Sequence, residues 1–342
     1  MKIAIVSSPY ERTPPEKYGG LERVVNLLTE GLVDKGHDIT LFGAENSITS
    51  AKLISYFGPP VKVFDIFIEY MQFLKVLDYT HKNNFDLIHC NNWYYSCLSN
   101  FSKIPIVTTL HVDLNLRYST VANLNSAYFV AISHNQKKRM KHNGVPVREV
   151  IYNSLDISSY DLNEQPDNYF AFLGMIAPHK GLHHAIYVAK KTGIPLKIGG
   201  KNDDPRYQAY FEKEIKPHID GEFIQYLGEL DDHQKKVLLR NALATLFPIE
   251  WHEPFGLVMI ESMACGTPVI AFNRGSVQEI VQEHQTGYVV QNVQEMCNRT
   301  REIEKIDRKR CHNFVRKYFN KDLMISNYER LFLNIIKHPS NL

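Results

Sequence analysis

The sequence contains little cysteine, and the cysteines show no pattern of a disulfide framework or a zinc site. Five are present among 342 residues without a CxxC pair, namely Cys90, Cys97, Cys265, Cys297 and Cys311. An odd number of unpatterned cysteines is typical of reduced thiols, so we expect a cytoplasmic protein.

Long apolar runs are also missing. The first apolar run, within MKIAIVSSPY, is too short for the apolar region of a signal peptide and too short to cross a bilayer. No later stretch reaches membrane-spanning length. The sequence therefore predicts no stable membrane insertion.

Sequence signatures of metal and nucleic-acid binding are absent as well. The 15 histidines include no HExxH motif, and His179, His183 and His184 have no accompanying carboxylate or thiolate cluster in the sequence. These absences predict that no metal is bound. The formal net charge of +2 favours no polyanionic partner such as a nucleic acid. Without a GxGxxG motif, the signal for a dinucleotide site is correspondingly weak.

The sequence does contain a rhythm of short apolar strands and helices, and this rhythm occurs twice. A chain of 342 residues suits two domains of about 150 to 180 residues each. In the first half we expect strands at 3–6, 38–42, 87–89, 104–108 and 128–132, and helices at 21–33, 61–81 and 134–142. After a polar linker at 158–168, we expect strands at 169–173, 196–198, 223–227, 244–247 and 269–272. This alternation predicts an α/β fold with two parallel, doubly wound sheets and a ligand cleft between their carboxyl ends.

The last segment, residues 321–337, has the pattern of an amphipathic helix. Its apolar stripe consists of Leu323, Met324, Ile325, Tyr328, Leu331, Phe332 and Ile335. Such a wide stripe is expected to pack on protein. We therefore predict a first Rossmann-like domain at 1–160, a second at 165–320 and a C-terminal helix at 321–342.

The most informative stretch is FPIEWHEPFGLVMIESMACGTPVIAFNRGSVQEIV, at 247–281. Pro254 fits the first turn of a helix, because its missing N–H would have no partner there. The amides of residues 255–257 would then face outward at the positive end of the helix dipole and attract an anion. Glu261 lies further along the same face and can accept hydrogen bonds from paired hydroxyls. Both features suit a diphosphate joined to sugar rings, although Pro and Glu are also common near helix starts that bind nothing.

Within this stretch, E-P-F-G-L-V-x-I-E and E-S-M-A-C-G-T-P-V-I-A resemble the donor-site signature of the retaining family-4 glycosyltransferases, which adopt the GT-B fold. Both acidic positions of that family's Glu-x7-Glu pattern are present, as Glu253 and Glu261. The resemblance implies two Rossmann-like domains that face each other across a cleft, the first for the acceptor and the second for the donor. It also implies that the C-terminal helix crosses back to the N-terminal domain. By this resemblance Glu261 holds the donor ribose, and Glu253 holds the sugar together with the amides of Phe255, Gly256 and Leu257.

Two elements of the first half resemble the same family. Gly19 and Gly20 lie between the first strand and a helix, either as an ordinary loop or as backbone that a ligand approaches closely. The family has a Gly-Gly loop here that faces the donor phosphates and the acceptor. His111 ends a strand, where a histidine is either structural or faces the cleft. Its position resembles the family's active-site histidine, which contacts the transferring sugar.

The second half keeps one basic element of the family and departs from it twice. Lys180 precedes a glycine as in the family's Lys-Gly element, which implies that it neutralises the departing diphosphate. Met175 stands where the family has arginine, so one of two cations is missing. Lys201 either supplies that charge or is an exposed loop lysine. Ser154 stands where the family has glycine, and serine tolerates left-handed backbone less readily.

The resemblance implies a retaining enzyme that moves a hexose from a nucleotide-diphosphate sugar to a hydroxyl acceptor. UDP-glucose is the default donor, on family frequency, and the acceptor has no sequence signature. We expect no metal or other cofactor, because no DxD-type carboxylate pair stands at a strand end. A phosphorylase of the same fold and a non-catalytic homologue that binds nucleotide sugars are the alternatives. The sequence gives no indication of the oligomeric state.

Overall fold

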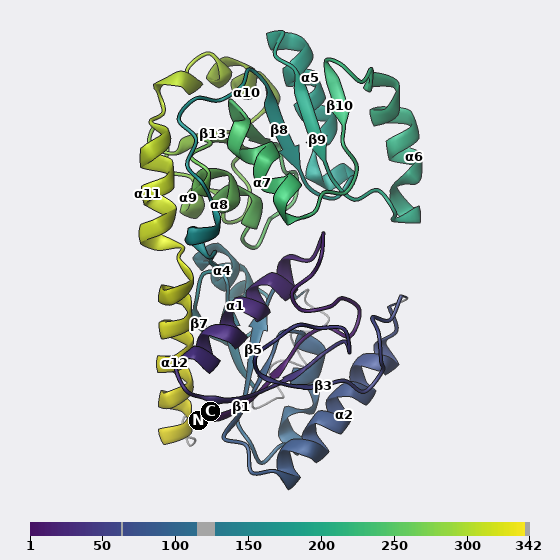
Figure 1. The fold of residues 1–342 in the computed structure, drawn as a ribbon, viewed down its shortest axis with the longest axis vertical. Coiled ribbons are helices and arrows are strands. Elements are labelled where there is room, and N and C mark those ends of the chain that lie inside the picture. Colours follow the sequence, from purple (N-terminus) through teal and green to yellow (C-terminus); the bar gives the residue numbers. More distant parts are fainter. Residues whose placement is uncertain (63, 115–126, 339–342) are drawn as a thin grey trace. The chain divides into compact units, whose positions relative to one another are not determined.

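The computed structural model describes residues 1–62, 64–114 and 127–338. The chain folds as two compact units, an N-terminal unit of Met1–Ser154 with Lys321–Leu342 and a C-terminal unit of Leu155–Asn320. Each unit is built on one parallel sheet with helices packed against it (Figure 1). Two parallel α/β sheets confirm the predicted doubly wound architecture.

The sheet of the N-terminal unit has the strand order β3-β2-β1-β4-β5-β6-β7, and every neighbouring pair is parallel. Its strands are β1 (Lys2–Val6), β2 (Asp38–Phe42), β3 (Lys52–Ile54), β4 (Leu87–Cys90), β5 (Ile106–Leu110), β6 (Tyr128–Ala131) and β7 (Val147–Val150). The chain runs from β1 to one edge of the sheet and returns at β4, so the strand order reverses between these two strands. Residues 3–6 of β1 are fully buried, which explains the continuous apolar run.

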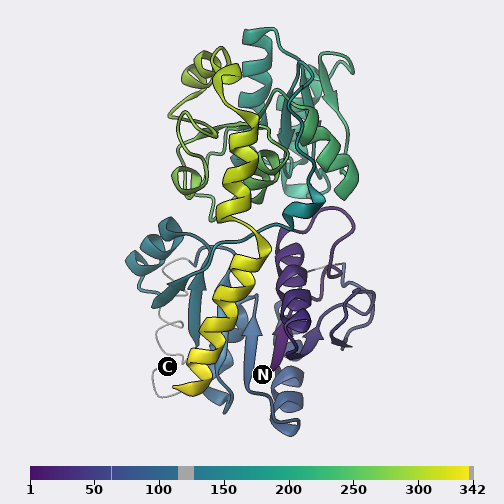
Figure 2. The same ribbon diagram turned by 60° about the vertical axis from the view of Figure 1, so that its left-hand side comes forward.

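The helices in the described residues of the N-terminal unit are α1 (Gly20–Asp34), α2 (Ile66–Lys82), η1 (Trp93–Phe101), α4 (His134–His142) and α12 (Lys321–Lys337). The last of these confirms that the C-terminal helix returns to the N-terminal domain, where it lies next to α1 (Figure 2). A Cβ atom on Gly31 of α1 would lie only 2.1 Å from Ile325 of α12, so the two helices are in close contact. Glu329 of α12 also binds Lys35 at 2.6 Å and His37 at 2.8 Å.

The sheet of the C-terminal unit has the order β10-β9-β8-β11-β12-β13 and is again parallel throughout. Its strands are β8 (Phe170–Leu173), β9 (Leu196–Gly199), β10 (Ile224–Tyr226), β11 (Ala244–Phe247), β12 (Val269–Phe272) and β13 (Gly287–Val290). Its α-helices are α5 (Leu182–Thr192), α6 (Gln208–Tyr210), α7 (Asp232–Asn241), α8 (Leu257–Ala264), α9 (Val277–Ile280), α10 (Val293–Thr300) and α11 (Arg308–Tyr318). Here the strand order reverses between β8 and β11.

The strands that the sequence did not predict all lie at sheet edges. They are β3, β7 and β13. The first two are only partly buried and carry charged residues, so they lack the apolar run on which the prediction depends. The third begins with Gly287, where a Cβ atom would lie 1.9 Å from the carbonyl oxygen of Val269. The close approach of the two backbones therefore requires glycine at the start of β13, although glycine has a low propensity for strands.

Two local expectations need correction. The segment predicted as a polar linker is not a free connection, because Tyr160 within it is buried against the C-terminal unit. Ser154 does not need left-handed backbone, since among the described non-glycine residues only Asn84 and His284 have positive φ. Its hydroxyl contacts the sulfur of Met324 at 3.2 Å. The serine is therefore accommodated without the predicted strain.

Candidate functional site

The turn after β8 and the loop after β11 meet where the strand order of the C-terminal unit reverses. Ligands of open parallel sheets bind at this point, outside the carboxyl ends of the strands. Lys180 ends the turn η3 (Pro178–Lys180), and Glu253 lies in the loop that follows β11. The Nζ atom of Lys180 lies 2.7 Å from Oε2 of Glu253, and both side chains are mostly buried. The structure thus brings together two of the predicted site residues.

Two glycines allow these loops to approach each other. Gly181 has φ of +73°, and a Cβ atom there would lie 1.9 Å from the carbonyl oxygen of Pro248. Gly275 has φ of +61°, and its Cβ would lie 2.2 Å from the carbonyl oxygen of Glu253. That carbonyl accepts a hydrogen bond from the amide of Ser276 at 3.0 Å. Any larger residue at either glycine would displace the loop that carries Glu253.

Trp251 contacts both members of the ion pair, a role that the sequence pattern did not assign to it. Its indole Nε1–H donates to Oε2 of Glu253 at 2.9 Å, the oxygen that Lys180 also binds. The Lys180 ammonium lies 5.0 Å from the centre of the indole ring, within cation–π range. His179 packs edge-on against the same ring at 5.4 Å. Within the described part of the chain no donor occupies Oε1 of Glu253, so this oxygen is available to a ligand.

The helix after Glu253 begins later than predicted. α8 starts at Leu257, and Gly256 precedes it in left-handed backbone with φ of +80°. Pro254 therefore lies in the loop and not in the first helical turn, because the left-handed residue interrupts the helix between them. Phe255 is buried and packs against Phe319, so only its backbone can face a ligand. The outward amides of this helix begin at Leu257 and Val258, since the amide of the next residue donates to Gly256 at 3.0 Å.

Glu261 lies on the buried face of α8 and pairs with Lys235 of α7. The two side chains are almost fully buried, and Nζ of Lys235 lies 2.5 Å from Oε1 of Glu261. The hydroxyl of Tyr160 donates to the same oxygen at 3.4 Å. Lys235 was also missed, although it shares its helix face with the buried Leu238 and Leu239. Lys235 and Tyr160 together fix the orientation of the Glu261 carboxylate.

His111 follows β5 and is held by Asn91, which follows β4. The side-chain amide of Asn91 donates to the carbonyl oxygen of Val6 at 3.1 Å, so its own oxygen accepts from Nε2–H of His111, also at 3.1 Å. Burial lowers the pKa of His111 to about 4. The imidazole is therefore neutral at physiological pH, with its proton on Nε2 and a lone pair on Nδ1.

His89 lies deeper in the same unit and has a structural role. Its Nε2 atom contacts the hydroxyl of Thr109 at 2.9 Å, and that hydroxyl contacts the phenol of Tyr328 in α12 at 2.8 Å. Burial, and secondarily the nearby His111, lowers the pKa of His89 to about 3. This network connects the C-terminal helix to two central strands.

The Gly-Gly loop lies at the start of α1. Gly19 has φ of +150°, and a Cβ atom there would lie 2.6 Å from Pro15 and 3.0 Å from the carboxylate of Glu22. Gly20 is the first residue of the helix. Glu22 in the first turn is buried, and its pKa is raised to about 7 by that burial. The backbone of Gly19 and the carboxylate of Glu22 are therefore packed closely together at the start of α1.

Lys201 and Met175 lie on loops after neighbouring strands. The ammonium of Lys201 pairs with Asp203 at 3.0 Å, and its side chain is 36% exposed. Its backbone carbonyl accepts from the amide of Ile176 at 2.9 Å. The structure therefore pairs Lys201 with Asp203, a carboxylate of its own loop. Met175 is half-buried.

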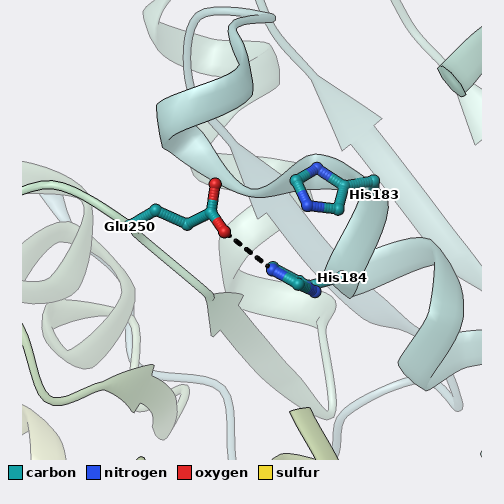
Figure 3. Close-up of side chains that lie close together, drawn as sticks. All are labelled: His183, His184 and Glu250. Atoms are coloured by element: carbon teal, nitrogen blue, oxygen red, sulfur yellow. Dashed lines mark hydrogen bonds and ion pairs between the residues drawn. The ribbon is translucent and has the colours of Figure 1, made fainter. Parts of the chain in front are cut away.

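The expectation that the histidines after β8 have no carboxylate beside them is wrong. Glu250, 66 positions further along the chain, contacts His184, with Oε1 at 3.1 Å from Nε2. Figure 3 shows that the rings of His183 and His184 and this carboxylate point toward one another. Their ligand atoms all lie within 4.8 Å of one another, the only metal-compatible group of this kind among the described residues.

Two protein-family models match the chain. The model described as Glycosyltransferase Family 4 matches residues 18–159, and the model described as Glycosyl transferases group 1 matches residues 157–319. Together they account for most of the chain. No helix in the described residues has the length and apolarity needed to span a membrane.

Known proteins resemble the chain over nearly its full length. N-acetyl-alpha-D-glucosaminyl L-malate synthase of Bacillus anthracis is 22% identical, with 100% of this chain and 99% of the relative covered. Sucrose-phosphate synthase from Thermosynechococcus elongatus has a TM-score of 0.83 at 19% identity, covering 98% and 99% of the two chains. HepE of Anabaena, solved in complex with UDP and glucose, has a TM-score of 0.79 at 18% identity, covering 98% and 100%. These likenesses confirm the GT-B fold with two Rossmann-like domains.

Proposed function

From the premise that the chain belongs to the glycosyltransferases of family 4 and group 1, we propose that it transfers a hexose from a UDP-linked donor to a hydroxyl acceptor with retention of configuration. Glucose is the default sugar. The observation that carries this proposal is the cluster of Lys180, Glu253 and Trp251 at the reversal of strand order in the C-terminal unit.

Lys180 is assigned to the leaving diphosphate. Without a ligand its ammonium satisfies Glu253 at 2.7 Å, and a phosphate oxygen is an equivalent anionic partner for it. The outward amides of α8, beginning at Leu257, add positive potential for the same group. A mostly buried cation acts strongly on developing negative charge, because little water screens it.

Glu253 is assigned to the sugar. The indole of Trp251 and the ammonium of Lys180 both bind its Oε2 atom, which fixes the plane of the carboxylate. Its Oε1 atom then accepts a hydrogen bond from a sugar hydroxyl. A carboxylate held by two donors makes this contact without losing its own orientation.

Glu261 is assigned to the ribose of the nucleotide. Lys235 and Tyr160 occupy its Oε1 atom, and within the described residues no donor occupies Oε2. This second oxygen can accept from the ribose hydroxyls. Lys235 pairs with the buried carboxylate and holds it in place in the absence of nucleotide, since a buried charge is tolerated only with a partner.

The reaction breaks the bond between the anomeric carbon and the β-phosphate oxygen, and the electron pair goes to that oxygen. The acceptor oxygen forms its bond to the anomeric carbon on the same face, and its proton passes to the departing diphosphate. Lys180 stabilises the charge on the leaving group. His111 is assigned to the sugar through its match to the family's active-site histidine, and its neutral state suits a hydrogen-bonding contact.

UDP is the proposed nucleotide because HepE was solved in complex with UDP and glucose. The name of the Bacillus anthracis relative includes a glucosaminyl group, so the sugar must be tested broadly. A thermal-shift panel should therefore compare UDP-glucose, UDP-galactose, UDP-N-acetylglucosamine, and the GDP and ADP sugars. We expect the largest rise in melting temperature with a UDP sugar.

Turnover with a panel of hydroxyl acceptors is then followed by release of free UDP, and the product's anomeric configuration is read by NMR. Free UDP together with retained configuration supports the proposal. Formation of sugar phosphate from inorganic phosphate would identify a phosphorylase. Donor binding without consumption in any acceptor panel would identify a non-catalytic homologue.

A further inference from the structure

Outside the residues assigned above, His183 and His184 of α5 and Glu250 after β11 bring two imidazoles and a carboxylate together (Figure 3). We propose that these three residues form a binding site for a divalent transition metal such as Zn²⁺. The site is separate from the residues assigned to the donor, and the metal is not required for transfer.

The spacing of the ligand atoms fits such an ion. Zinc binds nitrogen and carboxylate oxygen at about 2.0 to 2.1 Å, so two ligand atoms of a tetrahedral site lie about 3.3 Å apart. His184 Nε2 and Glu250 Oε1 are already 3.1 Å apart. All three ligand atoms lie within 4.8 Å of one another, so the ligand atom of His183 lies at most about 1.5 Å further from the other two than this spacing requires. The Glu250 side chain is 45% exposed and can shift toward His183 without disturbing the core.

His183 is oriented for metal binding by Tyr210. The phenol oxygen of Tyr210 lies 2.8 Å from Nδ1 of His183, which leaves Nε2 for the side that faces His184 and Glu250. A hydrogen bond at the second ring nitrogen is the usual way in which proteins orient a metal-binding histidine.

The donor set selects the class of metal. Two imidazoles and one carboxylate suit zinc, nickel, cobalt or copper, whereas magnesium and calcium prefer oxygen ligands throughout. Three protein ligands leave a fourth position for water.

The site lies on the same loop as the proposed sugar contact. Glu250 immediately precedes Trp251, and its amide donates to the carbonyl oxygen of His179 at 2.9 Å. A metal that joins Glu250 to α5 would restrain this loop. We therefore expect zinc to reduce donor turnover, a consequence that rests on the proposed function, whereas zinc binding itself does not.

Binding is tested with zinc chloride on the full chain after treatment with EDTA and removal of the chelator. We expect zinc to raise the melting temperature of the parent protein, and this rise to be lost in both His184→Gln and Glu250→Gln. His233→Gln, which changes an exposed histidine of α7 in the same unit, should keep it. Magnesium should have no effect. No rise in the parent, or an equal rise in the three variants, would overturn the site and leave the transferase proposal untouched.

The effect on the loop is tested separately by fluorescence. The chain has two tryptophans, so Trp93→Phe leaves Trp251 as the only source of tryptophan emission. Zinc should change the emission of this variant and saturate at one ion per chain, and His184→Gln in the same background should abolish the change. A melting shift without any change in emission or turnover would overturn the coupling to the loop, because Trp251 follows Glu250 directly.

Discussion

Replacing Lys180 by alanine removes the ammonium that lies 2.7 Å from Glu253 and 5.0 Å from the indole of Trp251. We expect Lys180→Ala to lower kcat by about a hundredfold or more, which is the effect of losing one preorganised electrostatic contact and corresponds to about 2.7 kcal/mol or more. Met175 occupies the position where the family has arginine, so no second cation at that position compensates for the loss of Lys180.

The loss should appear in kcat and not in folding. Although the Lys180–Glu253 pair is mostly buried, the indole of Trp251 still donates to the same carboxylate oxygen in the variant, so Glu253 keeps one hydrogen-bonding partner. The variant should therefore be folded at assay temperature. Since the proposed contact strengthens as charge develops on the diphosphate, kcat should fall more than KM rises.

The assay is steady-state release of UDP from the preferred donor, with melting temperature as the control for folding. Lys201→Ala is the matched control, because Lys201 pairs with Asp203 and should change kcat by no more than a few-fold. Met175→Arg should raise the affinity for UDP if this position faces the donor. Near-normal turnover in Lys180→Ala would refute the assignment, above all if Lys201→Ala were the inactive variant.

Three further predictions concern the carboxylates, metal dependence and acid stability. Glu253→Gln should lower turnover much more than UDP affinity, whereas Glu261→Gln should chiefly weaken UDP binding; an unchanged UDP isotherm in the second variant would contradict its role. Donor turnover should survive EDTA, and loss on chelation with recovery in magnesium or manganese would contradict this. The pKa of His89 is about 3, below the usual value near 6.5, so the unfolded chain takes up its proton first as the pH falls. This group should cost about 1.4 kcal/mol of stability per pH unit between about pH 6.5 and 3, so His89→Gln should show a shallower loss of melting temperature on acidification than the parent.

The central strands were predictable because their burial is recorded in the local sequence. β2, β11 and β12 have the predicted bounds, and each is dominated by the buried apolar residues that interior parallel strands require. Edge strands such as β3 and β7 lack that run, because one side of the strand has no neighbour and the exposed positions accept charged residues. Each edge strand forms because a neighbouring strand offers it backbone hydrogen bonds, and the local composition does not show where that neighbour lies.

The start of α8 shows a second limit. Proline at the first helical turn is a sound local rule, and it placed the helix start at Pro254. The structure delays the start to Leu257, because Gly256 adopts left-handed backbone between them. A Cβ atom on Gly256 would lie 2.7 Å from Met259, and a left-handed glycine there is a response to packing that no capping rule anticipates.

The proximity of the loops that carry Lys180 and Glu253 follows from the topology, since both loops come after the two strands between which the sheet order reverses. The partners that hold these groups do not follow from it. Trp251 reaches Oε2 of Glu253 through a local bend of its own loop, and Lys235 reaches Glu261 through the side-by-side register of α7 and α8. Such register depends on side-chain volumes throughout the unit and is not recorded near either residue. The sequence can therefore indicate which charged residues lie in the site. The orientation of each carboxylate, which determines the oxygen that a ligand can reach, depends on contacts that only the folded chain specifies.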